Sequence, residues 1–282
     1  MIRRRLGQTD LDVSILGLGG VTICDRPQED VNEEVQRAFD QGIRYFDVAP
    51  QYQNSQELMG PALEPFRKDV VLACKTLERT AEGAKRELDD SLKKLKTDHF
   101  DLYQLHAMTT EEDYKVAMSR GGAIETIMEA QKLGKIRYIG FSAHNEDIAL
   151  KLIDTGLFDS MLVPLNYVSF EAGFGPRMVS AANEKGMGIL ALKSMARTKL
   201  TGDRKYDKCW YEPEDRDDVI GMLLRYTLHL PGVAAAIPPG DPSLMRKGVE
   251  QILNNSSALS PVELKTLGTS LQTVSPLFPL EG

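Results

Sequence analysis

The chain has 282 residues, of which 42% are hydrophobic and 27% are charged, a balance typical of a globular protein with a sizeable core. Its net charge is −7, with acidic and basic residues interleaved, so we expect neither nucleic acid nor an anionic membrane as a partner. Three widely spaced cysteines exclude a fully paired disulfide framework and an all-cysteine zinc site. We therefore expect reduced thiols and no metal.

The N-terminus turns polar at once, with arginines at positions 3 to 5, and the apolar segment of a secretory signal does not follow. The sequence contains no run of 18 apolar residues, so it predicts no membrane span. Together with the odd number of cysteines, these features favour a cytoplasmic protein.

The first predicted elements are two short strands within 3–13, joined by a turn at 7–10, which form a hairpin in front of the main fold. From there strands alternate with helices along the whole chain. The predicted strands are 14–19, 43–47, 70–75, 100–105, 136–141, 161–165, 188–192 and 233–237. The predicted helices are 29–42, 55–63, 80–96, 122–133, 145–155, 176–185 and 215–229, with one or two more in 243–270.

This alternation calls for parallel strands and right-handed crossovers, and eight such units can close a barrel. We therefore predict one domain over 1–282, a (β/α)8 TIM barrel with an N-terminal β-hairpin. The alternative is an open, doubly wound sheet. The barrel is favoured because the glycines at 17–20 lack the third glycine and the helix start of a dinucleotide-binding fingerprint. The charged stretch 200–215 is the longest predicted loop.

Ionisable side chains end three consecutive predicted strands. Asp47, Lys75 and His106 occupy these strand ends, and Tyr52 lies in the loop after Asp47. The carboxyl ends of parallel strands meet at one end of a barrel, where active sites are found. The sequence thus predicts that the four side chains share one mouth. Each has a structural alternative, such as a core cap or a structural ion pair, and only their conjunction favours chemistry.

The four groups suit proton delivery. A phenol has an ordinary pKa of about 10, and a nearby ammonium lowers it. Charges about 4 Å apart interact by roughly 4 kcal/mol at an effective dielectric of about 20, or about three pKa units. Lys75 can thus bring the pKa of Tyr52 towards neutrality, with Asp47 keeping Lys75 charged. A neutral His106 can hydrogen-bond a carbonyl oxygen.

Four segments also carry a family resemblance. Residues 46–60 resemble the pattern D-T-A-x-x-Y-G-x-S-E-x-x-L-G, and residues 98–106 resemble D-x-x-D-L-Y-x-x-H. Residues 134–142 resemble G-K-I-R-x-I-G-x-S, and residues 4–14 resemble an N-terminal hairpin. Along nearly its full length the chain resembles the aldo-keto reductases, specifically the bacterial-type members with a short C-terminal tail.

The resemblance implies a barrel whose bottom is covered by the hairpin. It also implies reduction of an aldehyde or ketone, a small-molecule carbonyl substrate, by hydride transfer from NADP(H), with NAD(H) not excluded. Tyr52 would be the general acid, Lys75 would lower its pKa, Asp47 would support Lys75, and His106 would position the carbonyl.

Cofactor contacts are implied by the same resemblance, listed from the nicotinamide end to the adenosine end. They are Gly19, Gly20 and Val21 near the nicotinamide ribose, Ser142 and Asn166 at the carboxamide, Lys193 and Ser194 at the pyrophosphate, and Gly240 and Arg246 at the adenosine phosphate. Two positions depart from the family pattern. The family's Ser-Asn pair is Ser142-Ala143-His144 here, and His144 either substitutes for the missing Asn or caps the following helix. Leu192 stands where the family commonly has an aromatic residue.

Two other functions remain open from the sequence. A barrel lyase without redox turnover would use Lys75 to form a Schiff base with a carbonyl substrate. A regulatory subunit would bind the cofactor without turning over a substrate.

Overall fold

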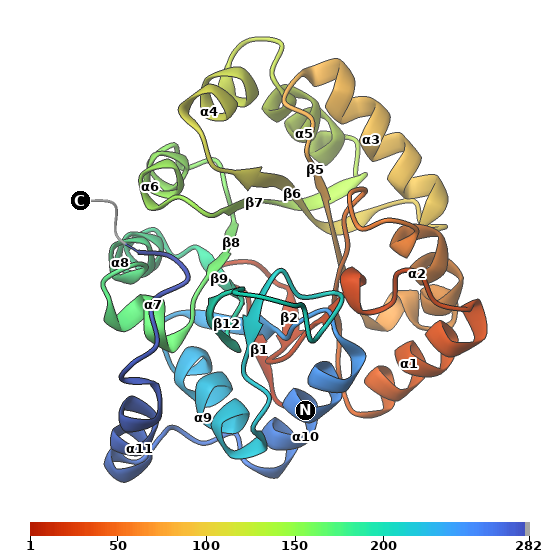
Figure 1. Cartoon of the computed structure of the whole chain (residues 1–282). Coiled ribbons are helices and arrows are strands. Elements are labelled where there is room, and N and C mark those ends of the chain that lie inside the picture. Colours follow the sequence, from red (N-terminus) through yellow and green to blue (C-terminus); the bar gives the residue numbers. More distant parts are fainter. Residues whose placement is uncertain (280–282) are drawn as a thin grey trace.

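The computed structural model describes residues 1–279, and the domain predicted over 1–282 therefore includes three residues outside this range. Eight strands pair in parallel and in chain order, with helices around them (Figure 1). The ring closes where Gly17 N donates to Ala236 O at 3.0 Å, beside a parallel bridge from Leu16 to Ala236. The predicted barrel is confirmed, and the open sheet is wrong. The strands are β3 (Leu18–Gly19), β4 (Tyr45–Asp47), β5 (Val71–Thr76), β6 (Phe100–Met108), β7 (Ile136–Ala143), β8 (Ser160–Pro164), β9 (Gly188–Leu192) and β12 (Val233–Ile237).

The predicted helices are present with ends shifted by a few residues. They are α1 (Gln28–Asp40), α2 (Ser55–Leu63), α3 (Ala81–Lys94), α5 (Ala123–Lys132), α6 (Glu146–Asp154), α8 (Pro176–Glu184), α9 (Asp217–Leu228), α10 (Pro242–Asn254) and α11 (Pro261–Leu271). Four short helices were not predicted: α4 (Glu111–Met118), α7 (Tyr167–Glu171), and the 3-10 helices η1 (Gly20–Thr22) and η2 (Glu64–Asp69). The helix α4 begins with a cap, in which the Thr110 side chain accepts a hydrogen bond from Asp113 N. It was not predicted because its apolar residues show little helical periodicity.

The predicted N-terminal hairpin is confirmed as β1 (Arg3–Arg5) paired antiparallel with β2 (Asp12–Ser14). Its turn packs closely on the barrel, because a Cβ at Gly7 would lie 2.3 Å from Gly188 N, and the φ of Gly7 is 55°. Leu6 of the hairpin is buried in the cluster that fills the barrel interior. The hairpin thus plugs the amino-terminal end of the barrel and leaves the carboxyl end for the site.

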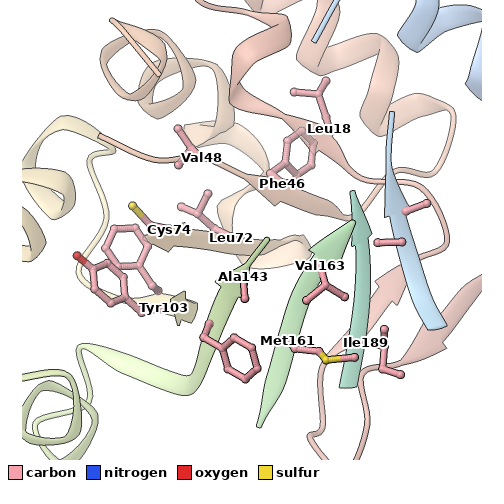
Figure 2. Close-up of a cluster of buried hydrophobic side chains, with 14 of the residues drawn as sticks. Leu18, Phe46, Val48, Leu72, Cys74, Tyr103, Ala143, Met161, Val163 and Ile189 are labelled. Carbon is pink, nitrogen blue, oxygen red and sulfur yellow. The ribbon is translucent and has the colours of Figure 1, made fainter. Parts of the chain in front are cut away.

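Side chains along the strands alternate between the barrel interior and the outer, helix-covered face. The interior cluster includes Leu6, Leu11, Val13, Tyr45, Val71, Ala73, Leu102, Leu162 and Leu190. The outer cluster, drawn in Figure 2, includes Phe46, Leu72, Cys74, Tyr103, Met161, Val163 and Ile189. Asp47 lies two residues after the inward Tyr45, and Lys75 two after the inward Ala73. The same period directs both polar side chains inward at the carboxyl end.

The segment after β9 differs from the predicted loop. It forms an antiparallel pair, β10 (Ala196–Lys199) with β11 (Tyr211–Pro213), and we call residues 196–213 the strap. Lys208 Nζ in the strap donates to the carbonyl oxygens of Thr22, at 3.3 Å, and Cys24. The strap therefore reaches across to the segment after β3. Within residues 1–279, no helix has the combined length and apolar character that crossing a bilayer needs.

Candidate active site

The structure brings together the four polar residues predicted to share one mouth. Asp47, Tyr52, Lys75 and His106 line one cavity at the carboxyl end of the barrel. Lys75 Nζ forms an ion pair with Asp47 and lies 5.1 Å from the centroid of the Tyr52 ring. The Tyr52 and His106 rings meet edge to face, with centroids 5.7 Å apart. The arrangement thus places a phenol between an amine and an imidazole.

Asp47 is held by partners that sequence reasoning missed. Its Oδ2 accepts from the Tyr45 hydroxyl at 3.0 Å and from Gln104 Nε2 at 3.2 Å, while Oδ1 faces Lys75. Tyr45 and Gln104 each lie two residues before a predicted site residue on the same strand, so they share its inward face. Both residues could have been identified from the sequence as polar side chains that lie two positions before a site residue in a buried strand.

The ion pair determines the charge of the amine. Burial alone would lower the pKa of Lys75, but the Asp47 carboxylate, together with Tyr52 and Cys74, outweighs burial and the pKa is raised. Lys75 is therefore an ammonium at neutral pH. An amine in this state is a poor nucleophile, because the free base is scarce.

Lys75 lowers the pKa of Tyr52 as predicted, but the predicted net shift of that pKa towards neutrality is wrong. Burial raises the pKa of Tyr52 above its ordinary value, and Lys75 opposes this rise without reversing it. The charge argument from the sequence left out desolvation, which penalises a buried phenolate. Tyr52 is thus a protonated phenol with a cation beside its ring.

His106 is a neutral imidazole, as the sequence suggested. Burial, with a smaller contribution from the nearby Lys75 charge, lowers the pKa of His106 to about 2. Its Nδ1 lies 3.0 Å from Oε1 of Gln51, in the loop after β4. The ring is therefore held from the rim of the cavity.

A second group of side chains lines the opposite wall. Lys193 is 5% exposed, and its Nζ lies 3.0 Å from His144 Nε2. Burial lowers the pKa of Lys193 to about 7. The amine lies 5.6 Å from the ring centroid of Trp210 in the strap and 5.2 Å from that of Phe278 near the C-terminus. Sequence reasoning did not place these aromatic rings, because they approach Lys193 from distant parts of the chain.

Comparison with known proteins identifies the class of enzyme to which this barrel belongs. The model of the aldo/keto reductase family matches residues 15–241, which is most of the chain. The chain belongs to the aldo/keto reductase family. The resemblance seen in the sequence motifs is thereby confirmed, and members of this family are oxidoreductases that use nicotinamide cofactors.

Individual relatives of this aldo/keto reductase are distant. L-Galactose dehydrogenase of Arabidopsis thaliana is 28% identical over 306 aligned residues, covering 96% of this chain and 92% of that protein. The uncharacterized oxidoreductase YqkF of Bacillus subtilis is 33% identical, over 51% of this chain and 49% of its own length. The holo form of an aldo-keto reductase from Bacillus halodurans superposes with a TM-score of 0.75 at 22% identity, covering 100% of this chain and 98% of that one.

The cofactor residues predicted for this aldo/keto reductase fall into two groups. Those that line the cavity are Gly19, Val21, Ser142, Lys193 and Gly240. Those that do not line it are Gly20, Asn166, Ser194 and Arg246. Gly20 lies beneath the rim, where a Cβ would come 2.9 Å from Val48, and a Cβ at Gly240 would come 2.4 Å from Val21. These glycines keep the chain segments around the mouth close together.

Three residues that follow the carboxyl ends of strands each carry a buried polar atom without a partner in the part of the chain that the structure describes, although none of the three lines the cavity. Asn166 Nδ2, Ser194 Oγ and Thr22 Oγ1 are buried and have no hydrogen-bond partner within residues 1–279. Leaving such atoms unpaired costs about 1–3 kcal/mol each, so they favour a ligand with matching groups. Asn166 also caps α7 through its Oδ1, which accepts from Ser169 N at 3.0 Å and leaves the amide hydrogens free.

Arg246 is engaged by a carboxylate. Its Nε lies 3.3 Å from Glu34 Oε1, and its Nη2 bonds to Oε2 of the same residue. Glu34 is buried and also pairs with Arg26 and Arg37. The predicted phosphate ligand is therefore already paired in this structure, and a phosphate would compete with Glu34 for its guanidinium.

Proposed function

We propose that the chain is a carbonyl reductase that converts an aldehyde or ketone to an alcohol with NADP(H), acting as one catalytic domain. The contact that supports this most directly is the buried Lys75–Asp47 pair beside the Tyr52 ring. A protonated phenol near a cation is suited to give a proton to an oxygen on which negative charge develops.

The proposed roles follow from the charges of the four groups. Tyr52 donates the proton to the carbonyl oxygen as general acid. Lys75, kept cationic by Asp47, stabilises the phenolate that remains, because opposite charges interact strongly in a buried site. His106 lines the substrate side of the cavity and orients the substrate.

The proposed cofactor contacts rest on the residues around the mouth. When bound, a nicotinamide cofactor supplies the hydride that this protein's own side chains cannot provide. Asn166 and Ser142 would hold its carboxamide, and Ser194 and Lys193 its pyrophosphate. The unpaired Asn166 Nδ2 and Ser194 Oγ support this assignment. Gly19, Gly20, Val21, Gly240 and Arg246 complete the proposed set.

A Schiff-base lyase is the weaker candidate. Its nucleophile would be Lys75, which the Asp47 carboxylate keeps protonated. Reductive trapping of a carbonyl substrate on Lys75 by borohydride would nevertheless establish it.

The test is the variant Tyr52→Phe, which removes the acid and keeps the ring. We expect reduction of a panel of aldehydes with NADPH or NADH to fall by at least about a hundredfold, the lower end of general acid contributions. Affinity for the coenzyme, measured by fluorescence titration, should change little. The matched control is Tyr114→Phe, since Tyr114 lies on α4 and does not line the cavity.

Near wild-type reduction by Tyr52→Phe would reject the role of Tyr52. Coenzyme binding without reduction of any aldehyde or ketone by the wild type would favour a regulatory subunit instead. These outcomes separate the proposed enzyme from the two alternatives.

A further inference from the structure

Two lysines with different surroundings line the cavity. Lys75 is paired with Asp47, which keeps its amine cationic. Lys193 is 5% exposed and lines the opposite wall, and no carboxylate contacts its amine within residues 1–279. A buried ammonium without a counterion is costly, because desolvation disfavours the charged form. The cavity therefore holds one lysine that stays charged and one that readily gives up its proton.

Lys193 has an unusual backbone conformation. Its φ is 59°, in the left-handed region that residues other than glycine seldom adopt. Such conformations cost of order 1–3 kcal/mol and are concentrated at functional sites. The strained residue directly follows β9, and its carbonyl oxygen accepts from Ala196 N at 2.9 Å, where the strap begins. A strained turn thus holds this amine at the mouth of the barrel.

The amine of Lys193 has one polar neighbour and two aromatic ones. Nζ lies 3.0 Å from Nε2 of His144, and 5.6 and 5.2 Å from the ring centroids of Trp210 and Phe278. Burial lowers the pKa of Lys193 to about 7, so about half of the amine is neutral at pH 7. Burial, with the Lys193 charge, lowers the pKa of His144 to about 3, so this imidazole is neutral.

A neutral lysine amine is a nucleophile for the carbon of a carbonyl group. We propose that Lys193 is a second carbonyl-binding site of the cavity, which captures an aldehyde reversibly as an imine when no coenzyme is bound. The entry of aldehydes into this cavity rests on the proposed reductase function. The site differs from the Schiff-base alternative at Lys75, where Asp47 holds the amine in its unreactive form.

The chemistry of capture needs no oxidant or reductant. The lone pair of the amine forms a bond to the carbonyl carbon, and the carbonyl oxygen leaves as water with the two amine hydrogens. A C=N bond thus replaces the C=O bond. Nε2 of His144 is close enough to Nζ to accept a proton from the amine during the attack.

The first test traps the imine in coenzyme-free protein. The whole protein is treated at pH 7 with limiting propanal and sodium cyanoborohydride, which reduces an imine to a stable propyl-lysine, and the labelled peptides are followed by mass spectrometry. Lys193 should be labelled at least about tenfold faster than Lys199, because an exposed lysine is almost entirely protonated at this pH. Lys75 should stay unlabelled.

Two results of the labelling would overturn the proposal. One is labelling of Lys193 no faster than that of Lys199. The other is labelling at Lys75 in place of Lys193, which would favour the Schiff-base lyase instead. Both results come from the wild-type protein, so neither depends on how well a variant folds.

Trp210 provides a second readout that needs neither turnover nor trapping. It is the single tryptophan of the chain, and its ring lies beside the Lys193 amine. Conversion of the amine to an imine removes a cation from the ring, so titration with propanal should change the tryptophan emission until the site is saturated. Propan-1-ol, which cannot form an imine, should cause no saturable change.

The matched variant for the fluorescence titration is Lys193→Arg, which keeps a cation near Trp210 but cannot form an imine. We expect it to lose the saturable response to propanal. Lys199→Met, which removes an exposed lysine of the strap, should respond as the wild type does. A response of Lys193→Arg equal to that of the wild type would reject Lys193 as the site.

The capture and the reductase function fail separately. If the protein reduces aldehydes with NADPH or NADH but Lys193 is not labelled, the capture is wrong and the reductase function stands. If Lys193 is labelled but no aldehyde or ketone is reduced with either coenzyme, the capture stands and the reductase function is wrong.

Discussion

Lys75 and Asp47 form an ion pair between neighbouring strands in which both side chains are almost completely buried, with exposures of 0% and 3%. Desolvation of two charges is costly, and the attraction offsets that cost only when the remaining polar atoms are also paired. Tyr45 and Gln104 provide those contacts at the second oxygen of Asp47. The pair is therefore one unit, and removing either charge leaves the other buried alone.

The first prediction concerns stability. Asp47→Asn leaves the Lys75 ammonium without its counterion, so the free energy of unfolding at pH 7 should fall by about 3–5 kcal/mol, as measured in urea. The double variant Asp47→Asn/Lys75→Met removes both charges and should recover much of the loss. A single variant within about 1 kcal/mol of the wild type would contradict this account, since such a change is ordinary for a point mutation.

The second prediction concerns pH. The raised pKa of Tyr52 keeps the phenol protonated at neutral pH, so carbonyl reduction should be nearly independent of pH until above the ordinary tyrosine value of about 10. Lys75 lowers the pKa of Tyr52, so Lys75→Met should move the alkaline limb of the residual activity to higher pH. The measurement is kcat against pH at saturating coenzyme. If the alkaline fall in activity moves to lower pH in Lys75→Met, Lys75 does not lower the pKa of Tyr52.

The third prediction concerns Lys193. Its pKa of about 7 means that the amine is cationic below neutrality and increasingly neutral above it. If it contacts the pyrophosphate, the Kd for NADPH should increase as the pH rises from 6 to 8, and Lys193→Met should bind more weakly and without this dependence. Lys199→Met, an exposed lysine on the strap, is the control and should retain the dependence. Equal pH dependence in both variants would exclude Lys193 as the source.

Sequence reasoning succeeded where a single strand carries the information. The apolar residues before Lys75 predict a buried strand. Its position at the end of that strand places Lys75 at the mouth of the barrel, and the alternation of side chains along a strand predicts that Lys75 points inward. The same reasoning located Asp47 and His106. Tyr45 and Gln104 share that alternation, but no role was predicted for them.

Contacts between distant segments were not predictable from one sequence. Arg246 meets Glu34 across 212 residues, and Lys208 of the strap reaches Thr22 across 186. The strap has no alternating apolar pattern, so its two short strands were not recognised. The prediction that the pKa of Tyr52 shifts towards neutrality failed for a different physical reason. Desolvation of the phenol depends on packing that a sequence does not describe.

The last prediction concerns the choice of coenzyme. Glu34 is 4% exposed; burial opposes its ionisation, but Arg246, Arg26 and Arg37 outweigh burial and lower its pKa. While Arg246 is paired with this carboxylate, it attracts a 2′-phosphate weakly. Glu34→Gln frees the guanidinium, so the preference for NADPH over NADH, measured as the ratio of kcat/KM values, should rise about tenfold, as one charge-assisted hydrogen bond would give.

The control for this prediction is the double variant Glu34→Gln/Arg246→Met, in which the gain should disappear because the phosphate ligand is absent. Arg246→Met alone should lower the preference for NADPH if the arginine contacts the phosphate at all. Both single variants also lose the ion pair between the half-exposed Arg246 and the buried Glu34, so their unfolding in urea is measured alongside to separate instability from recognition. An unchanged coenzyme ratio in Glu34→Gln, with the fold intact, would show that the choice is made elsewhere than at Arg246.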